Sequence, residues 1–239
     1  MLAVGLPPAD ARRLAEQSNG RIAIAAVNSM SSVTLSGERR ALEEAANDVE
    51  ASGGFWRFLN TDVPYHSPQM DELKPELLES LSGLAPQRTS VALFSTVEGR
   101  AIDGTELTPA YWARNMREPV AFAAAIEALL EIKHDLFLEV GPHPVLSTPI
   151  FETARYAGHQ ISVVSSLRRD EPERAALLGS LGHLYSLGCE IRIIPGNGNG
   201  SGFSLKTSTA QGSSDTAIRC LAAGRMRSSG ALASTCTVV

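Results

Sequence analysis

Residues 21–37 read RIAIAAVNSMSSVTLSG. Small and β-branched residues fill both halves of this stretch, and a polar tight turn at residues 28–31 separates them. The pattern predicts two adjacent strands joined by a short connection. This stretch decides the fold because it lies at the centre of a symmetrical pattern. On each side of it the sequence predicts first a helix and then a further strand.

The two flanking helices are predicted at residues 7–20, which open with two prolines, and at residues 37–54, which show an amphipathic period. MLAVGL at the start of the chain and FWRFLN at residues 55–60 have the composition of outer strands. The resulting order is β-α-β-β-α-β over residues 1–62. This order is typical of the split βαβ, ferredoxin-like unit.

Beyond residue 62, helical and strand patterns alternate. Residues 67–84 are predicted to be helical with Pro75 as an irregularity, and residues 108–132 form a helical pattern broken at Pro119. Asp103-Gly104 is a hairpin-turn signal. The apolar runs VALFSTV, LFLEVG and ISVVSSL read as strands. Such alternation predicts an α/β fold with a parallel, covered sheet.

The last part of the chain differs from the rest in charge and composition. Residues 1–190 carry a net charge of −9, whereas residues 191–239 carry +4. About half of residues 196–239 are Gly, Ser, Thr or Asn without an apolar period, which predicts a disordered tail. The three cysteines form no C-x-x-C pair, so they suggest neither a disulfide framework nor a zinc site.

Composition also argues against several function classes. The acidic body offers no basic face for nucleic acid. The sequence contains no run of about 18 apolar residues, so it does not predict a membrane-spanning helix. The N-terminus lacks the basic and apolar regions of a signal peptide. We therefore expect a cytoplasmic protein that binds neither nucleic acid nor membrane.

VPYHSPQM, residues 63–70, places His66 directly before a predicted helix start. Ser67 suits the N-cap, Pro68 suits the first helical position, and acidic residues follow. The positive end of the helix dipole disfavours an imidazolium there, and a general base has to be neutral. The same residues also suit a histidine that is only part of a turn, so both interpretations stay open.

A histidine base needs a nucleophile. No serine in the chain has glycine at both −2 and +2, as a nucleophile elbow requires, and no Walker-type phosphate loop exists. A second histidine, His143 in EVGPHPVL, lies in a glycine-proline context that favours a turn residue near the end of a strand.

Six stretches resemble, in the same order, the C-terminal half of a malonyl-CoA:acyl carrier protein acyltransferase domain of a type I polyketide synthase. They are MLAVGL, AAVNSMSSVTLSG, DVPYHSPQMDELKPEL, YWARNMREPVAFAAAI, FLEVGPHPVL and VVSSLRRDEPERAALLGSLGHLYSLG, which cover roughly residues 1–190. The resemblance implies a ferredoxin-like small subdomain at residues 1–62 and the C-terminal part of an α/β-hydrolase-like large subdomain at residues 63–160. A post-acyltransferase linker would follow at residues 161–195, and then the tail at residues 196–239.

The family reaction moves a malonyl-type extender from CoA to an acyl carrier protein through a Ser-His dyad. The resemblance therefore implies acyl-CoA, the carrier protein with its phosphopantetheine and neighbouring synthase domains as partners, with malonyl-CoA as substrate and no cofactor. His66 matches the family's general base. Asn115 matches the residue whose backbone carbonyl orients that histidine.

The resemblance places Val63, Pro64 and Tyr65, the three residues before the histidine, at the family motif that tracks extender choice. They match neither its usual malonyl form nor its usual methylmalonyl form, and Tyr65 occupies the position of the bulky phenylalanine of the malonyl form. A ring at Tyr65 would crowd an α-methyl branch, which favours malonyl. Discrimination on the scale of one methyl group amounts to about 1–3 kcal/mol.

In the family, the nucleophilic serine, the arginine that clamps the extender and an oxyanion-hole glutamine all precede the segment that matches MLAVGL. Their absence predicts an acyltransferase fragment that is inactive alone. A non-catalytic module that docks a carrier protein or synthase domains is the alternative, and a second chain could also supply the missing half. The abrupt change after about Ile194 suggests a frameshifted tail.

Overall fold

The computed structural model describes residues 1–194, 202–206 and 218–220. The chain divides into two compact units. The first unit contains residues 1–137 and 145–163, and the second contains residues 138–144 and the chain from residue 164 onward. The predicted ferredoxin-like subdomain and His66 both belong to the first unit.

The first unit opens with the predicted β-α-β-β-α-β order, which the structure confirms. Its elements are β1 (Leu2–Val4), α1 (Pro8–Gln17), β2 (Ile22–Ser29), β3 (Ser32–Gly37), α2 (Arg39–Ala51) and β4 (Trp56–Phe58). The strands pair antiparallel in the order β2-β3-β1-β4, so that β3 lies between β1 and β2 as the split βαβ arrangement requires. Strand β2 is therefore at one edge of this sheet.

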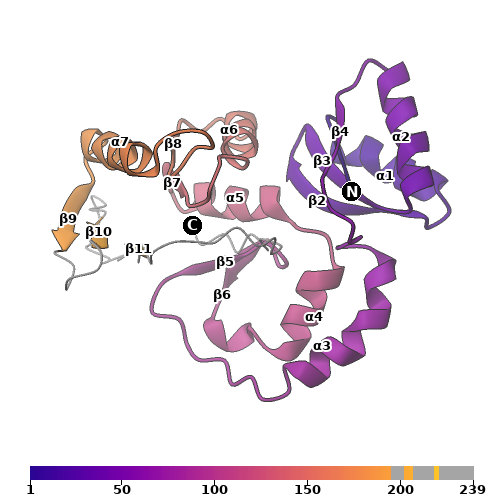
Figure 1. Ribbon diagram of the computed structural model, residues 1–239, viewed down its shortest axis with the longest axis horizontal. Helices are drawn as coiled ribbons and strands as arrows, with labels where there is room; N and C mark the ends of the chain where they lie inside the picture. The colour runs from indigo at the N-terminus through magenta and orange to yellow at the C-terminus, as the bar shows by residue number, and fades with distance from the viewer. Residues whose placement is uncertain (195–201, 207–217, 221–239) are drawn as a thin grey trace. The chain divides into compact units, whose positions relative to one another are not determined.

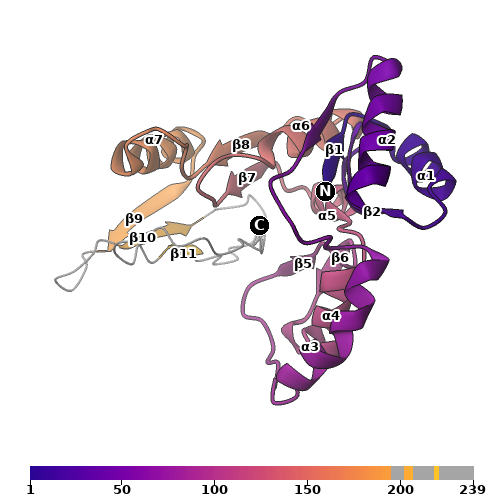
Figure 2. The same cartoon turned by 45° about the vertical axis from the view of Figure 1, so that its right-hand side comes forward.

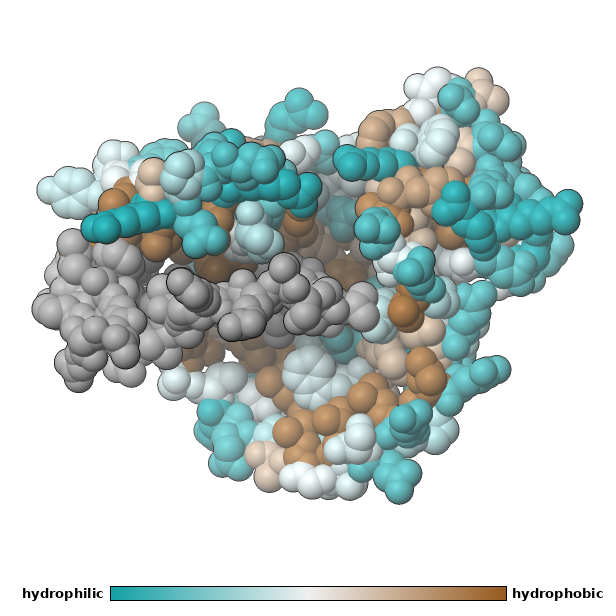
Figure 3. All heavy atoms as spheres, in the orientation of Figure 1, coloured by the Kyte–Doolittle hydropathy of each residue, from teal (hydrophilic) through white to brown (hydrophobic). Residues whose placement is uncertain are grey.

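One hydrophobic cluster stabilises this ferredoxin-like subdomain. Helices α1 and α2 lie on the same side of the sheet (Figures 1 and 2), and Leu2, Val33 and Leu35 between them are completely buried. The solvent-exposed face of α2 is charged, with Arg40 paired to Glu44 at 3.6 Å, and the surface there is hydrophilic (Figure 3). The amphipathic period therefore marks which face of the helix packs on the sheet.

Short elements make up the rest of the first unit. They are η1 (Pro68–Leu73), α3 (Lys74–Ser80), β5 (Leu93–Ser95), β6 (Arg100–Ile102), η2 (Gly104–Glu106), α4 (Pro109–Arg117), α5 (Phe122–Glu131) and α6 (Ser147–Tyr156), where η denotes a 3₁₀ helix. The predicted break at Pro119 is confirmed. The irregularity at Pro75 is confirmed too, because the chain changes there from 3₁₀ to α-helix.

The hairpin-turn prediction at Asp103-Gly104 is wrong. Asp103 instead caps η2: its carboxylate accepts from the Thr105 N–H at 3.0 Å, and the Glu106 side chain accepts from the Asp103 N–H at 2.9 Å. Aspartate with glutamate three residues later is a capping box, a signal that competes with the turn dipeptide. The actual hairpin joins β5 to β6 and contains Gly99 at φ 65°.

The alternation of strands and helices beyond residue 62 predicts a parallel sheet, and parallel pairing is found for one pair of these strands. Strands β7 (Leu136–Glu139) and β8 (Ser162–Ser165) form a two-stranded sheet. The Ser162 N–H donates to the Asp135 carbonyl at 2.7 Å and the Ser166 N–H to the Glu139 carbonyl at 2.9 Å, an unchanged offset that defines parallel strands. Strands β5 and β6 are antiparallel, so the prediction is wrong for them.

The second unit contains α7 (Glu173–Ser186) and the antiparallel strands β9 (Glu190–Ile194), β10 (Gly202–Lys206) and β11 (Ile218–Cys220). Strands β10 and β11 lie where the composition predicted disorder. Backbone pairing accounts for the difference, because ladder hydrogen bonds do not depend on an apolar period: β10 pairs with β9, and β11 pairs with β10. The remainder of the predicted tail lies outside the described residues.

Residues 116–121, which we call the connecting segment, tie the ferredoxin-like subdomain to the rest of the first unit. The Val120 N–H donates to the Ala25 carbonyl at 2.8 Å, and the Val27 N–H donates to the Val120 carbonyl at 2.9 Å. This one-residue parallel bridge satisfies edge groups of β2 that would otherwise be unpaired. At the far end of β2, the Ser29 hydroxyl donates to Glu152 of α6.

Gly37, at the end of β3, should be intolerant of a side chain. Its φ is 151°, and an added Cβ would lie 2.1 Å from the Arg21 carbonyl oxygen. We expect Gly37→Ala to lower the free energy of unfolding by about 1–3 kcal/mol in urea denaturation. Gly83→Ala is the matched control, because nothing lies within 4 Å of its added Cβ. Equal effects of the two substitutions would contradict the prediction.

Candidate active site

The backbone of His66 adopts a conformation that is rare for a residue other than glycine. Its φ is 60°, in the left-handed region. The His66 N–H donates to the Met116 carbonyl at 3.0 Å, which ties this residue to the connecting segment. Backbone strain of this kind persists only where surrounding contacts hold it, and it concentrates at functional sites.

The imidazole ring of His66 has a defined partner. Its Nδ1 lies 2.7 Å from the carbonyl oxygen of Glu118. Because a carbonyl can only accept, Nδ1 carries the proton and the lone pair of the neutral ring is on Nε2. This is the tautomer in which Nε2 can take a proton from a nucleophile.

The environment also keeps the ring neutral. Burial lowers the pKa of His66 below the usual histidine value, and the hydrogen bond to the Glu118 carbonyl opposes that shift. The sequence argument reached a neutral histidine through the helix dipole. The following helix η1 is a 3₁₀ helix, and the Ser67 hydroxyl donates back to the Pro64 carbonyl at 2.6 Å instead of capping it, so burial is the main cause.

The assignment of the orienting carbonyl to Asn115 is wrong by three residues, since Glu118 provides it. Asn115 lies in the last turn of α4, where carbonyls run along the helix axis. Glu118 follows the helix in an extended conformation, with ψ 156°, so its carbonyl leaves that direction. A local signal for this existed, because the residue before a proline is restricted to extended conformations and Pro119 comes next.

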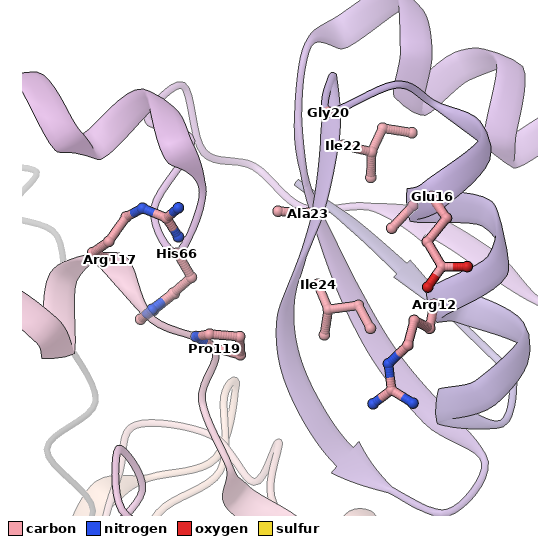
Figure 4. Close-up of a pocket in the computed structure, with 10 residues that line it drawn as sticks. Arg12, Glu16, Gly20, Ile22, Ala23, Ile24, His66, Arg117 and Pro119 are labelled. Carbon is pink, nitrogen blue, oxygen red and sulfur yellow. The ribbon is translucent and has the colours of Figure 1, made fainter.

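A pocket of about 370 Å³ lies beside His66 (Figure 4). His66, Arg117 and Pro119 line one side, and residues of α1, β2 and the turn between them line the other. The latter are Arg12, Ala15, Glu16, Gly20, Ile22, Ala23 and Ile24. The ferredoxin-like subdomain therefore provides one wall of the pocket that His66 also lines, which the sequence did not predict.

Arg117 is a pocket residue that sequence reasoning missed. Its Nε lies 3.1 Å from both carboxylate oxygens of Asp71 in η1. Lys74 and Arg117 together lower the pKa of the Asp71 carboxyl. Partly exposed pairs of this kind add little stability. The pair does tie the segment that follows His66 to the end of α4.

The remaining predicted site residues are placed as follows. The ring of Tyr65 is half-buried, with its centroid 6.4 Å from that of His66. Val63, Pro64 and Tyr65 do not line the pocket, and their part in substrate choice stays a prediction. His143, in the second unit, accepts a hydrogen bond from the Arg169 N–H at 3.3 Å, a contact suited to a turn residue.

The part of the chain that the structure describes offers neither a metal-binding cluster nor a membrane-spanning helix. In that part of the chain, no group of three or more His, Cys, Asp or Glu side chains could hold a metal ion. No helix there is long and apolar enough to cross a membrane.

Comparison with known proteins gives the family. The model of the acyl transferase domain family matches residues 1–190. The chain belongs to this family. A similar curated protein is erythronolide synthase EryA2 of Saccharopolyspora erythraea, which is 40% identical over 194 residues. That match covers 80% of this chain and 5% of the synthase, so this acyltransferase chain spans a small part of its curated relative.

Solved structures give the same family and fold. The acyltransferase domain from module 8 of the salinomycin polyketide synthase superposes with a TM-score of 0.76 at 35% identity, covering 78% of this chain and 44% of that one. A malonyl CoA-acyl carrier protein transacylase from Clostridium perfringens superposes with a TM-score of 0.67 at 23% identity, which shows the fold alone; the match covers 78% and 57% of the two chains. The α/β architecture is thus that of polyketide synthase acyltransferase domains.

The lowered pKa of His66 predicts a pH dependence of stability. Between the folded pKa and the unfolded value of about 6.5, the unfolded chain binds more protons than the folded chain. The free energy of unfolding should therefore fall as pH drops from about 7.5 to about 5.5. Urea denaturation at several pH values measures this, and NMR titration of the ring protons locates the pKa. The His66→Gln variant should lose this component, and an identical pH dependence in that variant would contradict the assignment.

Proposed function

We propose that His66 is the general base of a polyketide synthase acyltransferase site. The observation that carries the proposal is the tethered ring: Nδ1 is committed to the Glu118 carbonyl, so the lone pair is on Nε2, and His66 is one of the residues that line a pocket. Family membership and the names of the relatives support acyl transfer as the reaction class.

The proposed substrate is a malonyl-type acyl-CoA, and the proposed acceptor is the phosphopantetheine thiol of an acyl carrier protein. His66 Nε2 takes the proton of a serine hydroxyl while the serine oxygen attacks the thioester carbonyl, and the proton then leaves with the CoA thiol. In the second half, Nε2 takes the proton of the carrier thiol and returns it to the serine. Membership of the acyl transferase domain family supports this pairing of substrate and partner.

The 239 residues contain no serine in a G-x-S-x-G elbow. The base in this chain therefore lacks its usual nucleophile, and we expect no acyl-enzyme when the purified chain is mixed with malonyl-CoA. Intact-mass spectrometry measures this, with a complete acyltransferase domain as the positive control. A stoichiometric malonyl adduct on the chain would contradict the expectation.

The role of His66 can be tested in a complete site. Residues 1–190 would be joined behind the upstream half of the salinomycin module 8 acyltransferase, and self-acylation by malonyl-CoA would be timed. We expect His66→Ala to slow acylation by about 10²–10⁴-fold. His134→Ala, at an exposed histidine outside the pocket, is the control. Equal rates for the two variants would contradict the proposal.

The extender preference is tested in the same joined protein. Tyr65→Ser removes a half-buried ring beside His66, so the ratio of kcat/KM for methylmalonyl-CoA over malonyl-CoA should rise by about tenfold or more. Tyr65→Phe keeps the ring and should leave the ratio unchanged. A ratio that stays constant in Tyr65→Ser would show that this residue does not select the extender.

A second candidate function is docking of a carrier protein without catalysis. The ferredoxin-like subdomain favours this function because it has its own buried core. A surface for docking needs only that the subdomain folds, and it does not need a nucleophile. Titration of the labelled chain with an acyl carrier protein, followed by amide chemical shifts, separates the two functions. Shifts in the inactive chain would support docking.

A further inference from the structure

The main chain of the connecting segment forms hydrogen bonds to three parts of the first unit: His66, strand β2 and the residue that follows strand β5. The His66 N–H donates to the Met116 carbonyl, and the His66 ring donates to the Glu118 carbonyl at 2.7 Å. Two residues further on, Val120 makes both bonds of the bridge to β2. The Ala121 N–H then donates to the Thr96 carbonyl at 2.6 Å, just beyond β5.

The covalent path between the two sets of contacts is short and stiff. Only Pro119 separates Glu118, which holds the ring, from Val120, which holds the strand. The proline ring fixes its own φ, and its presence restricts Glu118 to an extended conformation. A displacement of Val120 is therefore transmitted to the Glu118 carbonyl instead of being absorbed by free rotation between them.

We propose that Val120 is a positioning residue, whose main-chain bridge to β2 holds the Glu118 carbonyl and, through it, the His66 ring in the orientation a base needs. The inference rests on the proposed function only in taking His66 as the base. It gives the ferredoxin-like subdomain a part in the chemistry besides forming one wall of the pocket.

One of the two hydrogen bonds of the bridge can be removed by a single substitution. The Val27 N–H points away from β3 toward Val120, so it contributes to the bridge and not to the sheet. Proline is tolerated at such an outward position of an edge strand. Val27→Pro therefore removes one bridge donor and leaves the β2–β3 ladder intact. Val27→Ala is the matched control, because it shortens the side chain and keeps the donor.

The measurement is the tautomer of the His66 ring, read from long-range ¹H–¹⁵N spectra of the labelled full chain. In the unmodified chain and in Val27→Ala we expect Nδ1–H as the major neutral form. In Val27→Pro we expect Nδ1–H to be lost as the major form. The buried methyl signals of Val33 and Leu35 report whether the sheet is retained. An unchanged tautomer in a folded Val27→Pro variant would overturn the proposal.

Amide hydrogen exchange tests the same coupling without a substitution, should Val27→Pro fail to fold. The amides of Val27, Val120 and His66 should exchange with one common opening rate, since they belong to one set of contacts. Independent exchange of the His66 amide would overturn the proposal. The two proposals can fail separately. If Val27→Pro changes the His66 tautomer as expected but His66→Ala does not slow acylation of the joined protein, the proposed function is rejected and the positioning role stands.

Discussion

The hydrogen bond from the His66 ring to the Glu118 carbonyl is the contact on which the rest of the site depends. A carbonyl oxygen cannot donate, so this single bond decides which ring nitrogen keeps the lone pair. Burial decides a different property, the charge, by lowering the pKa of the ring. Burial without the carbonyl would leave a neutral ring of undefined tautomer, whereas the carbonyl without burial would favour the imidazolium. A base needs both at the same residue.

The two effects have separate structural origins. Burial acts on the charge of the ring, and His66 lines a pocket whose other side is formed by residues of α1 and β2 in the ferredoxin-like subdomain. The carbonyl comes from the end of α4, where the helix stops because Pro119 cannot continue it. His66 reaches that carbonyl only in a left-handed backbone conformation, at φ 60°, which its own N–H stabilises by donating to Met116. The strain at His66 therefore belongs to the geometry that aims the ring.

Sequence periodicity was enough for the ferredoxin-like subdomain and not for the site. The strands and helices around residues 21–37 follow local apolar patterns, and every one of them formed. His66 was identified as a candidate base by its neighbours, although the expected cause, a helix dipole, gave way to burial. Asn115 was chosen by resemblance and missed the carbonyl by three residues. Strands β10 and β11 could not be predicted, because they form by backbone pairing and their Gly- and Ser-rich segment has no apolar period.

The contacts that no local pattern could reveal are those made by non-periodic backbone. Val120 pairs with Ala25 and Val27, about 95 residues earlier, through main-chain atoms that every residue type possesses. Even so, one residue in this region carries a readable signal. Pro119 ends the helix and restricts Glu118 to the extended conformation that frees its carbonyl, and the next residue, Val120, bridges the edge strand β2. Pro119, which local reasoning treats only as a helix terminator, therefore also places the acceptor for the base and the strand partner for the ferredoxin-like subdomain, which provides one wall of the pocket beside it.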